Sequence, residues 1–282
     1  MNKERLISEH PVEPAVREQI LDYLRRIEAE HDVQVLFACE SGSRGWGFAS
    51  PDSDYDVRFI YVHRLAWYLT VDAGRDVIEV PISGDLDING WDLRKALQLL
   101  KRSNPVLLEW LQSPIVYEQR ADEITRLSAL ALANFSAVRG YHHYLSMAQK
   151  AYRAYLQDSQ VRYKKYFYAL RPLLAARWVY EGRGVPPMRF AELAEAMLDD
   201  DALIAEINRL LEVKMRSSEA ARGAPWQRIQ TFIESELVAA ADRTIAQPRT
   251  VDGGALDTFL AETVLKQEQE RQNHDRNRRL GR

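Results

Sequence analysis

Cysteine is nearly absent from this 282-residue sequence: Cys39 is the single one, so no internal disulfide can form. The opening residues Met-Asn-Lys-Glu-Arg are followed by no apolar stretch of the kind that forms a signal peptide. No uninterrupted apolar run approaches the roughly 20 residues that a helix needs to cross a bilayer. These absences predict a protein of the reducing cytoplasm that does not insert into a membrane.

A large charge excess is lacking too. The formal net charge of −3 excludes a protein that is basic all over for binding nucleic acid, although it allows a local basic cleft. What is present is an ordinary hydrophobic content of 46%, which suits one large globular domain or two modest ones.

The first part of the chain mixes helix-like and strand-like patterns. Residues 14–30 carry apolar side chains at helical spacing with charged ones between them, which predicts an amphipathic helix. A second helix is predicted after Asp92, whose side chain suits an N-cap, and Asn104-Pro105 ends it. Runs rich in β-branched and aromatic residues predict a small mixed sheet built from residues 33–39, 55–62, 76–82 and 86–91.

Strand-like patterns disappear beyond about residue 119. Helical periodicity replaces them at 122–157, 162–181, 190–213 and 225–246. The predicted fold class is α+β, with an all-α part after a sheet-containing part. A doubly wound parallel sheet is disfavoured because the strand-like runs lie early and close together. We expect domains at 1–118 and 119–265, followed by a charged tail at 266–282.

Two aspartates open the second strand-like run. Asp54 and Asp56 are two positions apart, so both carboxylates lie on one face of a strand, where like charges need a cation. Phosphoryl and nucleotidyl transfer use two divalent cations, and Mg²⁺ prefers oxygen ligands. A third acid is then expected on a neighbouring strand. Asp87 fits best, because Asp85 lies at a turn and Asp92 suits a helix cap; solvated strand-end acids are the plainer alternative.

Gly42 and Ser43 stand where the first strand ends. A glycine there lets backbone N–H groups approach phosphate oxygens, and the serine hydroxyl adds a donor, although an isolated Gly-Ser pair is most simply a turn. The pair gains meaning from its context: a strand, Gly-Ser, ten intervening residues, and then Asp-x-Asp opening an apolar strand.

The stretch SGSRGWGFASPDSDYDVRFIYV, residues 41–62, resembles the signature of the DNA polymerase β-like nucleotidyltransferase superfamily. Two more stretches, DLDINGWDLRKALQLLKRSNPVLLEWLQSPIVY and KKYFYALRPLLAARW, resemble the RlaP-type predicted nucleotidyltransferases, a branch associated with RNA repair operons. The resemblance runs to about residue 190. In related sequences the third acid stands eight residues before a helix lysine, which matches Asp87 and Lys95.

This resemblance implies a palm-like domain, with a small mixed sheet flanked by helices, that binds two Mg²⁺ ions or Mn²⁺ as an alternative. Asp54 and Asp56 would bind both metals and Asp87 the catalytic one. A nucleoside triphosphate such as ATP would lie over Gly42 and Ser43. Such enzymes transfer a nucleoside monophosphate to a hydroxyl and release pyrophosphate.

Cations and one aromatic ring are predicted to complete the nucleotide site. Lys164, Tyr168 and Arg171 fall at i, i+4 and i+7 of one helix, where they either bind the triphosphate and base or form a solvent-facing stripe. The resemblance favours binding, because a helical domain often faces the palm in this superfamily. Arg44, next to the Gly-Ser pair, and Lys95 are further candidates for phosphate contact.

The leading functional hypothesis is a Mg²⁺-dependent nucleotidyltransferase that acts on an RNA 3′ end. The acceptor and the oligomeric state stay open, because transfer to a protein side chain or a small molecule would use the same chemistry. The third hypothesis is a non-catalytic nucleotide sensor, which the presence of all three acids disfavours.

Overall fold

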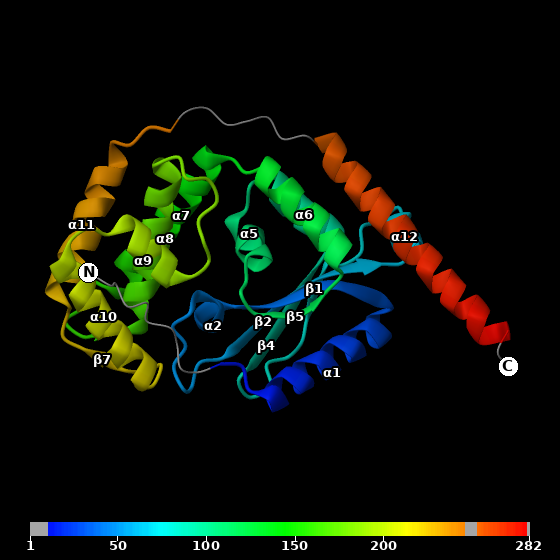
Figure 1. Cartoon of the computed structure of the whole chain (residues 1–282), viewed down its shortest axis with the longest axis horizontal. Coiled ribbons are helices and arrows are strands. Elements are labelled where there is room, and N and C mark those ends of the chain that lie inside the picture. Colours follow the sequence, from blue (N-terminus) through cyan, green and yellow to red (C-terminus); the bar gives the residue numbers. More distant parts are fainter. Residues whose placement is uncertain (1–10, 246–252, 281–282) are drawn as a thin grey trace.

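The computed structural model describes residues 11–245 and 253–280 of the chain. Figure 1 shows two lobes. The sheet lobe holds a five-stranded sheet of order β3-β4-β2-β1-β5 with helices on both faces, and the helical lobe is formed by α7 to α11 beside it. The predicted α+β fold class is confirmed.

The sheet is mixed, as predicted. β1 (Val33–Ser41) lies antiparallel to β2 (Tyr55–His63) and to β5 (Val116–Gln119). β4 (Leu86–Asp92) runs parallel to β2, and the short edge strand β3 (Val77–Glu79) is antiparallel to β4. The sequence analysis did not predict β5, because four residues are too few to show a clear alternation.

Helices cover both faces of the sheet, so β1 is buried over most of its length. α1 (Pro14–His31) packs on one face, and α4 (Leu93–Lys101) and α5 (Pro105–Leu111) pack on the other. A β-bulge after Val35 shifts the alternation of side chains along β1. Leu36 and Phe37, although adjacent, therefore both enter the core on the face covered by α4 and α5.

α6 (Ala121–Ala133) and α12 (Gly253–Leu280) complete the cover of the second face. The predicted domain limits at 1–118 and 119–265 stay predictions. The cores group the elements differently, because α6 and α12 lie after residue 118 but contribute to the core of the sheet lobe. The predicted tail is part of α12 as far as Leu280; residues 281–282 lie outside the described ranges. Within those ranges, no helix is both long and apolar enough to span a bilayer.

The helical lobe is built around two long helices that follow one another in the chain, α7 (Ala137–Tyr155) and α8 (Lys164–Tyr180). They pack extensively together. Phe48 of the sheet lobe enters this core, with ring centroids 5.0 Å from Phe167 and 5.9 Å from Phe190. The remaining elements are α9 (Phe190–Met197), α10 (Asp201–Arg216), α11 (Gln227–Ala241) and a hairpin of β6 (Val161–Arg162) and β7 (Arg222–Gly223).

Two of the predicted helices are each divided in the structure. The run at 122–157 becomes α6 and α7, where Ser136 caps α7 by accepting a hydrogen bond from the Arg139 amide. The run at 190–213 becomes α9 and α10, where Asp200 caps α10. Both breaks carry a capping residue that the periodicity alone did not mark. Residue 246, the predicted end of the last run, lies outside the described residues.

Candidate active site

The Gly-Ser pair opens a short helix, α2 (Gly42–Trp46), between β1 and β2. Gly42 adopts φ +67°, a left-handed conformation that favours glycine. A Cβ atom at this position would overlap the Asp56 carboxylate, lying 2.8 Å from its carboxyl carbon. Gly42 therefore allows the start of α2 to approach Asp56 closely, which a larger residue would prevent.

The structure brings the three predicted acids to one end of the sheet. Asp56 on β2 is paired in register with Asp87 on the parallel strand β4, and neighbouring strands lie about 4.8 Å apart. Asp54 lies two residues before Asp56, and its pKa is raised by burial and by the nearby charges of Asp85 and Glu219. The expected gathering of like charges is thus present.

Arg58 supplies a positive charge between Asp56 and Asp87 in the structure. Its Nη2 atom lies 3.1 Å from Oδ1 of Asp56 and 2.7 Å from Oδ2 of Asp87, and its Nη1 atom donates to the Asp87 carbonyl. The sequence analysis missed it. The signal was available, since Arg58 follows Asp56 by two positions and therefore shares its strand face.

The pKa of Asp56 is raised to about 6. Burial is the main cause; Arg58 opposes it, and the charges of Asp87 and Asp54 add to it. Arg58 therefore offsets only part of the cost of holding these carboxylates together, so the group still favours a further cation.

The residues present suit a hard cation in donor chemistry, because the group offers carboxylate oxygens alone. Arg58 contacts one oxygen of Asp56 and one of Asp87, and the Oδ2 atom of Asp56 faces Gly42. In the arrangement described for residues 11–245 and 253–280, no three His, Cys, Asp or Glu side chains already converge as a metal site. Asp54, Asp56 and Asp87 therefore stay the predicted metal ligands, and a bound ion would have to draw their carboxylates closer together.

Glu40 supports Asp56 from inside the sheet lobe. It is fully buried, accepts a hydrogen bond from the Asp56 amide at 2.8 Å, and accepts another from the Tyr117 hydroxyl. Burial raises the pKa of Glu40 to about 7, against the opposing effect of the Tyr117 bond. The sequence analysis did not identify Glu40, because its partner Tyr117 lies on the unpredicted strand β5.

Asp85 and Asp92, the two alternatives to Asp87 as the third acid, lie in a turn and at a helix cap. Asp85 lies in the turn before β4, where its carbonyl accepts a hydrogen bond from the Tyr55 amide. Asp92 caps α4 by accepting a hydrogen bond from the Arg94 amide, which confirms its predicted role as a helix cap. It also accepts a bond from the Tyr68 hydroxyl of α3 (Leu65–Tyr68).

The helical lobe brings two predicted residues to the carboxylates. Lys164 makes a 2.8 Å ion pair with Glu219, and both influence the pKa of Asp54. The pKa of Tyr168 is raised to about 12 by burial and by the charges of Asp56, Glu219 and Asp54, so Tyr168 lies within electrostatic range of the same group. Lys164 and Tyr168 therefore stand across from the acids.

Glu219 also joins the lobes. It accepts a hydrogen bond from Ser53 at 2.6 Å and pairs with the buried Lys214 at 3.1 Å. Burial would raise the pKa of Glu219, but the bonds from Lys164 and Ser53 outweigh it and lower the pKa to about 2. Sequence reasoning missed Glu219 and Lys214, because no local pattern connects them with Ser53.

Three other predicted nucleotide-binding residues have protein partners of their own, and their role in nucleotide binding stays a prediction. Arg44 is buried under the Asp-x-Asp segment, where it donates to the Ser53 carbonyl and lies 3.9 Å from the Tyr55 ring centroid. Arg171 is buried too, in a 2.9 Å ion pair with Glu109. Lys164 and Tyr168 lie on a partly exposed stretch of this helix face, whereas Arg171, further along the same face, is covered by other residues. The helical spacing of the three residues therefore did not predict the burial of Arg171.

Lys95 lies at the opposite end of β4 from Asp87. The strand runs five residues from Asp87 to Asp92, about 16 Å at 3.3 Å per residue, before α4 begins. Lys95 pairs there with Asp76 at 3.1 Å. Its spacing from Asp87 in sequence therefore does not bring it to the acids.

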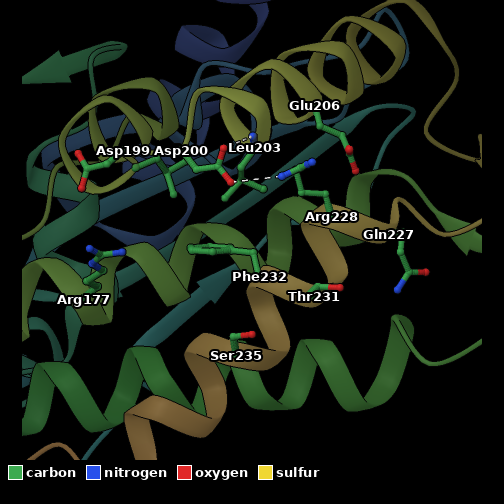
Figure 2. Close-up of a pocket in the computed structure, with 11 residues that line it drawn as sticks. Arg177, Asp199, Asp200, Leu203, Glu206, Gln227, Arg228, Thr231, Phe232 and Ser235 are labelled. Carbon is green, nitrogen blue, oxygen red and sulfur yellow. Dashed lines mark hydrogen bonds and ion pairs between the residues drawn. The ribbon is translucent and has the colours of Figure 1, made fainter.

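A separate cavity of about 750 Å³ lies in the helical lobe between α8, α10 and α11 (Figure 2). Phe232 points into it, and an ion pair between Arg228 and Asp200 crosses its rim at 3.4 Å. None of the predicted site residues lines this cavity.

Comparison with known proteins gives matches along most of the chain. The sequence profile described as RlaP, RNA repair pathway DNA polymerase beta family, matches residues 16–262. A relative from Bacillus subtilis (strain 168), "Uncharacterized protein YcgL", is 46% identical over 222 residues, which cover 79% of this chain and 85% of that protein.

Among solved structures, a nucleotidyltransferase-like protein from Exiguobacterium sibiricum 255-15 aligns over 87% of this chain and 76% of its own, with 14% identity and a TM-score of 0.29. The family match and the Bacillus relative both extend from the sheet lobe into the helical lobe. The chain therefore belongs to RlaP, the RNA repair pathway DNA polymerase beta family.

Proposed function

We propose that this protein is a Mg²⁺-dependent nucleotidyltransferase that moves a nucleoside monophosphate from a nucleoside triphosphate, such as ATP, to the 3′-hydroxyl of RNA. The observation that carries the proposal is the register pair of Asp56 and Asp87 with Gly42 against Asp56. Acids on adjacent strands and a close backbone approach are what a triphosphate with bound cations requires.

The acids have distinct roles in this proposal. Asp54, Asp56 and Asp87 would hold the Mg²⁺ ions. When bound, the ions would supply positive charge for the triphosphate and lower the pKa of the acceptor hydroxyl. Arg58 keeps Asp56 and Asp87 at a fixed separation through one oxygen of each. Glu40 keeps the backbone of Asp56 in place.

The triphosphate lies over the start of α2, where the left-handed Gly42 brings the backbone close and Ser43 follows. The acceptor oxygen attacks the α-phosphorus, the bond to the β-phosphate oxygen breaks, and pyrophosphate leaves. Asp87 is the nearest candidate to receive the hydroxyl proton. Lys164 contributes charge from the helical lobe, and Tyr168 offers a ring to the base.

Membership of a family described by RNA repair supports an RNA acceptor. A protein side chain or small molecule remains the alternative acceptor, and a nucleotide sensor is the non-catalytic alternative. All three readings predict nucleotide binding, so the product of the reaction decides between them.

The test incubates the protein with Mg²⁺ and each α-³²P nucleoside triphosphate, together with RNA ending in a 3′-hydroxyl, RNA ending in a 3′-phosphate, total cell protein, or no acceptor. Label in the 3′-hydroxyl RNA alone is the expected result. Asp56→Asn and Asp87→Asn should abolish it, whereas Asp72→Asn, on an exposed loop, should not. Label on protein would show that the acceptor is a protein and not RNA. Nucleotide binding without pyrophosphate release would overturn the proposal that the protein is an enzyme.

A further inference from the structure

Two partly exposed tyrosines of the helical lobe share one lysine. Tyr155, the last residue of α7, is 44% exposed, and Tyr168 of α8 is 38% exposed. Lys165 joins them, with Nζ 4.0 Å from the Tyr155 ring centroid and 4.6 Å from that of Tyr168. We call these three residues the tyrosine–lysine surface. Aromatic side chains of this size are normally buried, so paired exposed rings indicate a contact surface.

Three cations gather at the tyrosine–lysine surface. Lys165 lies near Lys164 and the exposed Arg162, and its pKa is lowered by burial and by the charges of both, against the opposing charge of Glu219. Lys164 is paired with Glu219, but across the described part of the chain neither Lys165 nor Arg162 has a carboxylate at ion-pair distance. A polyanion would therefore relieve repulsion at this surface.

Tyr168 links this surface to the acids. Its ring makes an edge contact with Trp46 of α2, with centroids 5.6 Å apart, and α2 begins at Gly42 beside the Asp56 carboxylate. A chain bound along Tyr155 and Lys165 would thus lead toward α2 and Asp56, where an acceptor must present its terminal hydroxyl to the triphosphate.

We infer that the tyrosine–lysine surface binds the last nucleotides of a single-stranded nucleic acid acceptor. Phosphates contact Lys165 and Arg162, and an unpaired base stacks on Tyr155, next to the Tyr168 ring that is proposed for the base of the triphosphate. Duplex ends fit poorly, since paired bases do not expose their faces to side chains. This inference rests on the proposed function, for which it names the acceptor-binding residues.

The experiment measures fluorescence anisotropy of a 5′-fluorescein single-stranded RNA at fixed salt, without nucleotide. Tyr155→Ala and Lys165→Gln should each weaken binding about tenfold, the range expected for loss of one stacked base or one phosphate contact. Tyr180→Ala is the matched control. Tyr180 is 43% exposed with Arg243 over its ring, but lies about 18 Å further along α8.

Equal RNA affinity of Tyr155→Ala and the wild type would overturn the inference, and so would equal affinity for a blunt duplex of the same length. Affinity for a fluorescent nucleotide should not change in Tyr155→Ala, which shows that the variant is folded. RNA binding that depends on this surface in a protein that transfers no label would support the inference while overturning the proposed function. Label transfer to RNA together with unchanged RNA binding by the variants would support the proposed function and overturn this inference.

Discussion

Nη2 of Arg58 lies 2.7 Å from Oδ2 of Asp87, across the junction between the parallel strands β2 and β4. The same atom reaches Asp56, so one guanidinium joins the two acids on which the proposed chemistry depends. Arg58 contacts one oxygen of each carboxylate, and the second oxygen of Asp56 faces Gly42. Arg58 therefore positions the acids in the absence of a metal.

Replacing Arg58 with Gln should destabilise the metal-free protein by about 1–3 kcal/mol, because two half-buried carboxylates lose their counter-charge. Millimolar Mg²⁺ should then raise the melting temperature of Arg58→Gln more than that of the wild type, since the ion replaces the lost charge. Thermal unfolding with and without Mg²⁺ measures both effects. Arg75→Gln, at an exposed ion pair, is the control. Equal Mg²⁺ shifts in the two proteins would contradict the positioning role.

Replacing Gly42 with Ala should displace the Asp56 carboxylate and reduce nucleotidyl transfer at least ~100-fold. It should also cost about 1–2 kcal/mol of stability for the left-handed backbone. Gly84→Ala separates the two effects, because Gly84 has φ +60° with no atom within 4 Å of an added Cβ. Transfer rates and urea unfolding measure them. A Gly42→Ala enzyme as active as Gly84→Ala would refute the close approach.

Asp92 makes stability depend on pH. Burial raises its pKa from 3.8 to about 6, against the opposing bond from Tyr68. A raised carboxyl pKa means that the folded state holds the proton more tightly, so this stabilisation is present at low pH and disappears as pH rises through about 6. Between pH 5 and pH 7.5 the loss should be about 1 kcal/mol.

Asp92→Asn keeps the helix cap and removes the charge, so its free energy of unfolding should lack this decrease. Urea unfolding of both proteins at the two pH values gives the difference directly. Parallel pH profiles would show that Asp92 ionises in the folded state as it does in the unfolded chain.

Arg171→Met should lower the free energy of unfolding by about 3–5 kcal/mol, because it leaves the Glu109 carboxylate buried without its partner. Arg171→Met combined with Glu109→Leu should recover much of that loss, as apolar replacements of both partners often do. Nucleotide affinity of the folded double variant should equal that of the wild type. A selective loss of nucleotide affinity would restore the original prediction that Arg171 contacts phosphate.

Local patterns in the sequence predicted the strands that carry the acids, because alternation and β-branched runs are strong over β1, β2 and β4. The same alternation led to Asp56 and Asp87 as strand acids, and both lie on strands in the structure. Asp54 was predicted to share the strand face of Asp56, but it lies one residue before β2 begins. Their roles in catalysis stay predictions.

What the sequence did not reveal depends on contacts between distant segments. Arg171 has its partner on α5, and Glu219 meets Ser53 from the other lobe, so neither environment follows from helical phase. Lys95 was a candidate for phosphate contact, but the sequence did not reveal that it lies beyond the far end of β4 from Asp87, where it pairs with Asp76. Arg58 was overlooked although its strand face was predictable.

α12 makes the sheet lobe depend on a segment that is far from the sheet in the sequence. Its Leu256 and Phe259 lie in the same core as Phe37 of β1, so the second face of the sheet is closed only where α12 packs beside α4 and α6. A deletion or cut between the helical lobe and α12 should therefore expose the core of the sheet that carries Asp56 and Asp87, although it removes none of the predicted site residues.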